Sequence, residues 1–255
     1  MFARNVLYFD DHSTVVNSPN RVEEIRKNIT EGDVYVARNV FPKALIKRMI
    51  EYLSKVGSGS LPNYRKIAPG CPNFHRLNCW DPRAYVQGCF HQFVFFPWNQ
   101  DVLNLFALTA EVYHMKNLLS GNRKDKFLGV EPEDGCTARL AFQFYPKGIG
   151  GLNKHSDPLD HHQLSVPALT MSKKGIDFKG GGAYVEGEKV RIYLDEISEP
   201  GDVVYFNAIL PHGVERIDPD EKVDWLSFEG RWMLLFATNK LFDNAAIRDA
   251  VDLER

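Results

Sequence analysis

Length, composition and charge set the outer limits. The chain has 255 residues, 44% of them hydrophobic, so it can bury a sizeable core and we expect one domain over residues 1–255. Its formal net charge is -2 and no long block of like charges occurs, which disfavours a broad surface for nucleic acid or anionic membrane. No apolar stretch approaches the ~18 residues of a membrane helix. We therefore expect a cytoplasmic protein whose partner is a small molecule, with an oligomeric state that the sequence leaves open.

The first half of the chain, residues 1–134, is expected to form helices and loops that support a later β-rich region. Apolar residues recur every three or four positions in several stretches, which is typical of amphipathic helices. Helices are predicted over residues 21–29, 41–56 and 101–119, with a short strand over 33–37 and a Gly, Ser and Pro-rich loop over 57–70. The four cysteines form no CxxC pair and are expected to be reduced.

Residues 74–85 mix aromatic and polar side chains without a clean period. Two interpretations stay open: the aromatic residues fill the core, or the segment is a binding loop. As a binding loop it would place Trp80 and Arg83 in a polar and aromatic lid over a substrate. Such a lid suits a small polar metabolite.

After residue 136 the pattern changes from helical to short strands separated by turns. Strands are predicted over residues 139–145, around His155, and over 164–171, 182–185, 190–194, 202–206, 213–217 and 231–238. Eight short strands suffice for a mainly β protein with flanking helices and a double-stranded β-helix core, the jelly-roll or cupin-like fold, over residues 135–240. The remaining tail, residues 241–255, is expected to be a helix packed on the outside.

The tripeptide His155-Ser156-Asp157 carries the chemistry. Residues two apart on a strand point to the same face, so His155 and Asp157 can reach one metal ion. His212, far along the chain, can supply a third ligand. Two imidazoles and one carboxylate on one face of an octahedron suit non-haem Fe(II), because three neighbouring positions stay open for a co-substrate and O2.

The strand over residues 139–145 alternates in character. Leu140, Phe142 and Phe144 share one face, whereas Gln143 and Tyr145 lie on the other together with Arg139. An amphipathic surface strand would show the same alternation. We favour a polar barrel lumen, because Gln143 and Tyr145 come shortly before His155.

An ordered series of motifs resembles the Fe(II)/2-oxoglutarate-dependent oxygenase superfamily. The series includes QFYPKG before the HSD tripeptide, then DFKGG, GDVVYF and PHGV, and finally GRWMLL near the end of the β-rich region. The resemblance covers residues 135–240 well and the first hundred-odd residues only in outline. It implies the double-stranded β-helix fold and an oxygenase activity.

The resemblance also implies roles for matching positions. His155, Asp157 and His212 are the implied Fe(II) ligands. Arg231 is the implied partner of the distal carboxylate of 2-oxoglutarate, for which a planar guanidinium is well suited. Tyr145 and Gln143 resemble positions that hold the co-substrate by hydrogen bonds.

The anchoring arginine has two rivals within the chain. Arg231 follows His212 at a greater distance than is usual in the superfamily, so residues 218–229 are expected to be an insertion. Arg216 and Arg139 are therefore alternatives for the same task. We place Arg231 first, since it alternates toward the same side of its strand as Met233.

The implied activity is oxidation, chiefly hydroxylation, of an unactivated C–H bond of a small polar metabolite, amino acid or natural-product intermediate, with release of succinate and CO2. Desaturation and cyclisation stay open, whereas halogenation is disfavoured because Asp157 is present. His161, close to the tripeptide, is a further candidate for substrate contact. The alternatives are a non-catalytic jelly-roll binding or sensor protein, and an oxygenase that acts on a protein or nucleic acid.

Overall fold

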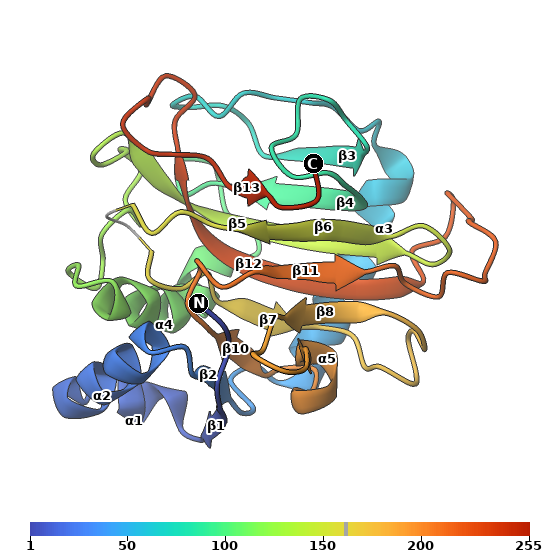
Figure 1. Cartoon of the computed structure of the whole chain (residues 1–255). Helices are drawn as coiled ribbons and strands as arrows, with labels where there is room; N and C mark the ends of the chain where they lie inside the picture. The colour runs from blue at the N-terminus through green and yellow to red at the C-terminus, as the bar shows by residue number, and fades with distance from the viewer. Residues whose placement is uncertain (161–162) are drawn as a thin grey trace.

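The computed structural model describes residues 1–160 and 163–255. Within them, thirteen strands form one continuous sheet that folds on itself (Figure 1). The strands are β1 (Val6–Phe9), β2 (Val34–Ala37), β3 (Phe74–Cys79), β4 (Gly88–Phe95), β5 (Cys136–Pro146), β6 (Gly151–Ser156), β7 (Ala168–Thr170), β8 (Gly182–Val185), β9 (Ile192–Tyr193), β10 (Val203–Tyr205), β11 (His212–Glu215), β12 (Gly230–Lys240) and β13 (Val251–Asp252). The helices are α1 (His12–Val16), α2 (Pro19–Thr30), α3 (Lys43–Gly59), α4 (Leu105–Leu119) and α5 (Leu194–Ile197).

Eight of the strands, β5 to β12, form the double-stranded β-helix that the sequence predicts. One layer pairs β5, β12, β7 and β10 in that order, and the other pairs β6, β11, β8 and β9. Strand β4 pairs with both β5 and β6 and so connects the layers along one edge. Side chains from both layers, among them Tyr145 and Met233 from one and Val185 and Val214 from the other, share a buried apolar cluster. The space between the layers is the barrel lumen.

The alternation in β5 separates this lumen from a second core on the other face of the layer. Leu140, Phe142 and Phe144 pack in the larger apolar cluster, together with residues of the helices, whereas Tyr145 belongs to the lumen cluster. The two faces predicted from the sequence are therefore confirmed. Because successive side chains of a strand point to opposite faces, Arg139 and Gln143 share the lumen face with Tyr145.

Helices cover the outer face of the layer that contains β5 and β12. In α3 the buried residues are Ile46, Met49 and Leu53, and they pack in the larger cluster with Ile25 of α2 and Val112 of α4. Figure 1 shows α1, α2 and α4 gathered at one end of the barrel. The helices and the strand predicted in residues 1–134 are all present, with ends shifted by a few residues. Among the described residues, no helix has the combination of length and apolar character needed to cross a bilayer.

The predicted C-terminal helix is wrong. Residues 241–255 form turns and the short strand β13, in which Val251 pairs with Ser156 and Asp252 with His155 of β6. The Asp252 carboxylate also accepts a hydrogen bond from the Gln87 backbone N–H at 2.9 Å. Pairing with the main chain of β6 outweighs the weak helical spacing of the tail, because tertiary contacts override local propensity.

Two buried histidines make the stability of the fold depend on pH. Burial lowers the pKa of His12 to about 4, and burial, followed by the nearby His75 ring, lowers the pKa of His91 to about 4. His12 Nε2 lies 2.7 Å from the Tyr205 hydroxyl and His91 Nδ1 lies 2.8 Å from His75 Nε2. An unfolded histidine titrates near ~6.5, so the unfolded chain binds more protons between pH 6.5 and 4.

We predict that the free energy of unfolding, measured by urea denaturation, falls as the pH is lowered from 7 to 5. Replacing His91 with Gln should remove about 1–2 kcal/mol of that fall, since one titrating group is lost. The matched control is His114→Gln on α4, whose side chain is partly exposed beside Asp125. Equal falls in the wild type and in His91→Gln would contradict the account.

Candidate metal centre

Two neighbouring strands of the lumen bring His155, Asp157 and His212 together. His155 of β6 lies opposite His212 of β11 in the register, and their ring centroids are 4.1 Å apart. Asp157 directly follows β6, and its Oδ2 lies 3.7 Å from His212 Nε2. One ligand atom from each residue lies within 4.8 Å of the others, close enough to hold one metal ion.

Hydrogen bonds to main-chain carbonyls fix both imidazoles. His155 Nδ1 lies 2.9 Å from the Asn153 carbonyl oxygen, and His212 Nδ1 lies 2.7 Å from the Leu210 carbonyl oxygen. A carbonyl only accepts, so each Nδ1 carries the proton and donates it, and each Nε2 keeps its lone pair for a metal. The chain thereby selects the tautomer that a metal ligand needs.

Burial and a close approach of backbone complete the arrangement. Burial, followed by the neighbouring His155, lowers the pKa of His212 to about 4, so the ring is neutral at pH 7. A neutral imidazole is the form that binds metals. At Gly213 a Cβ atom would meet the Leu152 carbonyl oxygen at 2.9 Å, so a glycine is required for β11 to lie this close to β6.

The donor set fits Fe(II). Two imidazole nitrogens and one carboxylate oxygen form a facial triad, which leaves three positions of an octahedral ion for other ligands. The backbone N–H of Asp157 donates to the Ala208 carbonyl oxygen at 2.9 Å, which holds the residue after the end of β6.

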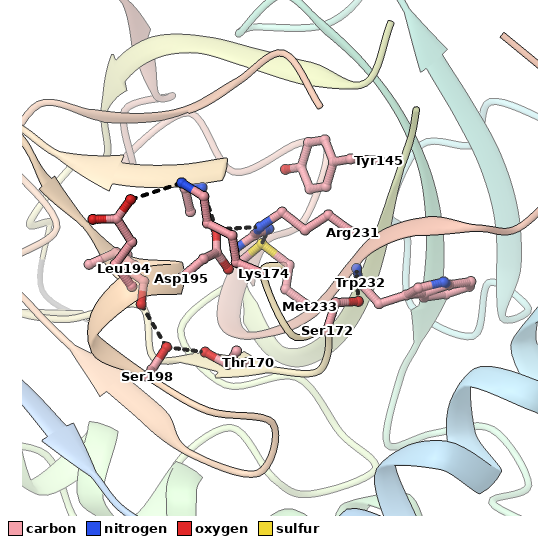
Figure 2. Close-up of polar contacts among 12 residues, drawn as sticks. Tyr145, Thr170, Ser172, Lys174, Leu194, Asp195, Ser198, Arg231, Trp232 and Met233 are labelled. Carbon is pink, nitrogen blue, oxygen red and sulfur yellow. Dashed lines mark hydrogen bonds and ion pairs between the residues drawn. The ribbon is translucent and has the colours of Figure 1, made fainter. Parts of the chain in front are cut away.

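Arg231 and Tyr145 lie side by side in the same lumen (Figure 2). They are opposite each other on β12 and β5, and the Arg231 guanidinium carbon is 5.6 Å from the centroid of the Tyr145 ring. The Tyr145 hydroxyl donates to Gln143 Oε1 at 2.6 Å. All three side chains are buried, so the structure brings together the residues that the sequence analysis assigns to 2-oxoglutarate.

The sequence gives no sign of the partner that Arg231 has in the structure. Arg231 Nε donates to Asp195 Oδ2 at 2.8 Å, and both side chains are only 3% exposed. The same oxygen accepts the Ala183 backbone N–H at 2.6 Å. Asp195 lies in the short helix α5, in no recognisable motif, so only the folded chain reveals the pair. Asp195 engages the Nε of the guanidinium, whose two Nη groups can still face a carboxylate.

The two rival arginines lie elsewhere. Arg216 is exposed, whereas Arg231 is buried. Arg139 is on the lumen face of β5, opposite Ala237 of β12. Burial, and then the nearby Arg76, lower the pKa of Arg139 to about 10, and the Asp157 carboxylate acts in the opposite direction. Arg139 therefore lies near Asp157 of the candidate metal centre. Arg231 lies at the other end of the β5–β12 pairing, opposite Tyr145.

The predicted substrate residues are only partly brought together. Residues 74–79 form β3, so the predicted loop begins only after Cys79. Arg83 donates three hydrogen bonds to the Asp81 carboxylate, two from its guanidinium and one from its backbone N–H. Its guanidinium lies 4.2 Å from the centroid of the Tyr64 ring, and the residue borders a pocket of about 80 Å³. Trp80 is 46% exposed and is not among the residues that line this pocket. His161 lies outside the described residues.

The chain was compared with family models, curated proteins and solved structures, and the solved structures share its fold. Neither a family model nor a curated protein matches the sequence. Among solved structures, a prolyl-4-hydroxylase of Pseudomonas putida superposes with a TM-score of 0.52 at 12% identity, over 86% of this chain and 98% of that one. A putative oxygenase from Shewanella oneidensis gives 0.51 at 12% identity, over 92% and 89%.

A third similar structure is that of JOX2 in complex with 2OG, Fe and JA, with a TM-score of 0.50 at 15% identity, over 94% of this chain and 76% of that one. At such identities the likeness is one of fold. The predicted fold class is thus confirmed: the chain has the double-stranded β-helix fold found in Fe(II)/2-oxoglutarate oxygenases.

We predict that Ala in place of His155, Asp157 or His212 weakens binding of Co(II) or Mn(II) by about 10–100-fold or more, since each change removes one of three donors. Calorimetry of the metal-free protein measures the affinity, and circular dichroism checks that the fold persists. His114→Ala, a histidine of α4, is the control. Wild-type affinity in any triad variant would disprove the site.

We further predict that Arg231→Gln lowers the free energy of unfolding by about 3–5 kcal/mol, because it leaves the Asp195 carboxylate buried without its partner. Arg26→Gln, which breaks an exposed pair with Glu23 on α2, should cost less than ~1 kcal/mol. Urea denaturation of both variants gives the comparison. Equal losses would mean that the buried pair has no special role in stability.

Proposed function

We propose that the protein is an Fe(II)- and 2-oxoglutarate-dependent dioxygenase that oxidises, chiefly by hydroxylation, an unactivated C–H bond of a small polar molecule. The observation that carries the proposal is the triad of His155, Asp157 and His212, with both imidazoles held in the metal-binding tautomer and facing the lumen that contains Arg231. The fold shared with a protein crystallised with 2OG and Fe supports it.

Bound iron and 2-oxoglutarate would supply the oxidising chemistry, in which O2 is consumed and the co-substrate is converted to succinate and CO2. The chain's own residues bind and orient these groups. His155, Asp157 and His212 would hold the metal. Asp157 occupies a position that would otherwise be free for a halide, which favours hydroxylation, desaturation or cyclisation.

Arg231 and Tyr145 would anchor the distal carboxylate of 2-oxoglutarate. The Arg231 guanidinium is held through Nε by Asp195, so its remaining donors have a fixed direction before any ligand binds. A pre-oriented planar donor loses little entropy when it pairs with a carboxylate. The Tyr145 hydroxyl is nearby and donates a hydrogen bond to Gln143 Oε1. The same hydroxyl could donate to a carboxylate oxygen of the ligand in place of Gln143.

A small molecule suits the site better than a macromolecule. The candidate metal ligands and Arg231 lie between the two layers of the β-helix, where His155 and Arg231 are buried and the side chains of His212 and Asp157 are only 14% and 22% exposed. The formal net charge of -2 favours no polyanion. We therefore place a small polar metabolite, amino acid or natural-product intermediate before a protein or nucleic acid as the substrate.

The test is anaerobic titration of the full chain with Fe(II) and then 2-oxoglutarate, followed by exposure to O2. We expect a visible metal-to-ligand charge-transfer band on addition of 2-oxoglutarate, and slow release of succinate when O2 is admitted. Both signals require the triad, so Asp157→Ala should lose them. Arg231→Gln should keep metal affinity while its affinity for 2-oxoglutarate falls by about 10-fold or more.

The wild type decides between the proposed oxygenase and a binding or sensor protein of the same fold. Absence of both the band and succinate, in protein that binds Fe(II) at the triad, would leave a non-catalytic jelly-roll protein. His114→Ala, outside the lumen on α4, is the control and should behave as the wild type.

A further inference from the structure

Two arginines on the lumen face of the sheet have no hydrogen-bond acceptor in the part of the chain that the structure describes. Arg76 of β3 pairs across the sheet with Gln92 of β4, and Gln92 pairs with Gln143 of β5. Arg139 is four residues before Gln143 on the same strand and therefore shares its face. The register thus places both guanidinium groups on the side of the sheet that faces the lumen.

Both groups are buried in part and unpaired. The Nε atoms of Arg76 and Arg139 are inaccessible to solvent and have no hydrogen-bond partner, and no ion pair with either side chain occurs among the described residues. Other arginines are paired: Arg83 with Asp81, and Arg231 with Asp195. A buried charge without a partner is costly, so its retention calls for a ligand.

Two amides beside the arginines also lack partners. Asn78 Oδ1 on β3 and Gln92 Oε1 on β4 are buried and accept no hydrogen bond from residues 1–160 or 163–255. Asn78 lies two residues after Arg76 on the same face of its strand, and Gln92 is opposite Arg76. Four neighbouring polar side chains thus have unused hydrogen-bonding capacity on one stretch of the lumen wall, a strong departure from the rule that buried polar groups are satisfied.

The candidate metal centre lies close to one of these arginines, Arg139. Arg139 is opposite Ala237, which packs with Ala208 and Val166 in a small apolar cluster. The Ala208 carbonyl accepts the backbone N–H of Asp157, and Leu159 packs against the same cluster. Ala208, Ala237 and Val166 therefore form a short apolar wall near both Arg139 and Asp157, and the Asp157 carboxylate is close enough to act against the lowering of the Arg139 pKa.

We propose that Arg76 and Arg139 bind a carboxylate of the substrate, with the apolar part of that molecule over the wall of Ala208, Ala237 and Val166, so that a C–H bond lies toward the metal. This rests on the proposed oxygenase function. A guanidinium pairs with a carboxylate through two parallel hydrogen bonds, and two guanidinium groups fix both its position and its plane.

Charge favours a single carboxylate over a phosphate. Fe(II) with Asp157 has one net positive charge, 2-oxoglutarate has two negative charges, and the Arg231–Asp195 pair has none. Arg76 and Arg139 then leave the filled lumen with one positive charge in excess. A substrate with one negative charge neutralises it, whereas a phosphate monoester, with about -1.5 to -2 at pH 7, overcompensates.

The experiment uses the full chain loaded with Mn(II) and 2-oxoglutarate, which cannot turn over. Butanoate, hexanoate and 3-phenylpropanoate are titrated by calorimetry, each beside its primary amide, and inorganic phosphate is titrated alone. We expect at least one carboxylate to bind about 10-fold or more tightly than its amide and than phosphate. Arg76→Gln and Arg139→Gln should each remove that preference.

Two controls separate this inference from the proposed function. Both variants should keep wild-type affinity for 2-oxoglutarate, and Arg26→Gln on α2 should match the wild type throughout. Without ligand, Arg139→Gln should melt at or above the wild-type temperature, because no partner loses its bond. A lowered melting temperature would indicate a structural role and overturn the proposal.

Further results would overturn either the carboxylate site or the proposed function. Equal binding of carboxylates and amides, tighter binding of phosphate, or a preference that persists in both variants would overturn the carboxylate site. Loss of 2-oxoglutarate binding in Arg139→Gln would assign the pair to the co-substrate and likewise overturn it. Failure of the wild type to bind 2-oxoglutarate at all would instead refute the proposed function.

Discussion

The pairing of β6 with β11 is the constraint on which the site depends. It sets His155 opposite His212, and it leaves Asp157 at the end of β6 with its carboxylate turned to the same point. Each imidazole then donates its Nδ1 proton to a carbonyl two residues earlier in its own chain segment. The three candidate ligands are thus positioned by main-chain geometry, and the strand pairing that builds the fold also brings them together.

Buried arginines on the lumen face are found in two arrangements, one paired with a carboxylate and the other without such a partner among the described residues. Asp195 neutralises the charge of Arg231 and orients its guanidinium group, although burying both ions carries a desolvation cost. Elsewhere on the lumen face, Arg76 and Arg139 are partly buried, and their Nε atoms have no acceptor among the described residues. A paired arginine is a stable anchor that is ready for a ligand used in every turnover, whereas an unpaired one is a source of strain that a ligand relieves. The two arrangements suit a common co-substrate and a specific substrate respectively.

Much of this could be predicted from the sequence because it depends on local periodicity. The alternation from Arg139 to Tyr145 predicts the lumen face, and the spacing of His155 and Asp157 predicts two side chains that can reach one ion, as their positions in the structure allow. Features that depend on distant contacts could not be predicted. Asp195 reaches Arg231 only through the fold, and the tail of the chain pairs with β6 although Ala246 and Ile247 have helical spacing. That Arg139 Nε has no partner among the residues that the structure describes is likewise a property of the folded chain alone.

A crystal structure of the full chain with Mn(II) and 2-oxoglutarate tests the central claim most directly. The account predicts one metal ion bound by His155 Nε2, Asp157 and His212 Nε2, with the keto acid on the metal and its distal carboxylate on the Nη groups of Arg231. Metal at another position, or a 2-oxoglutarate carboxylate on Arg139 with Arg231 left only to Asp195, would contradict it.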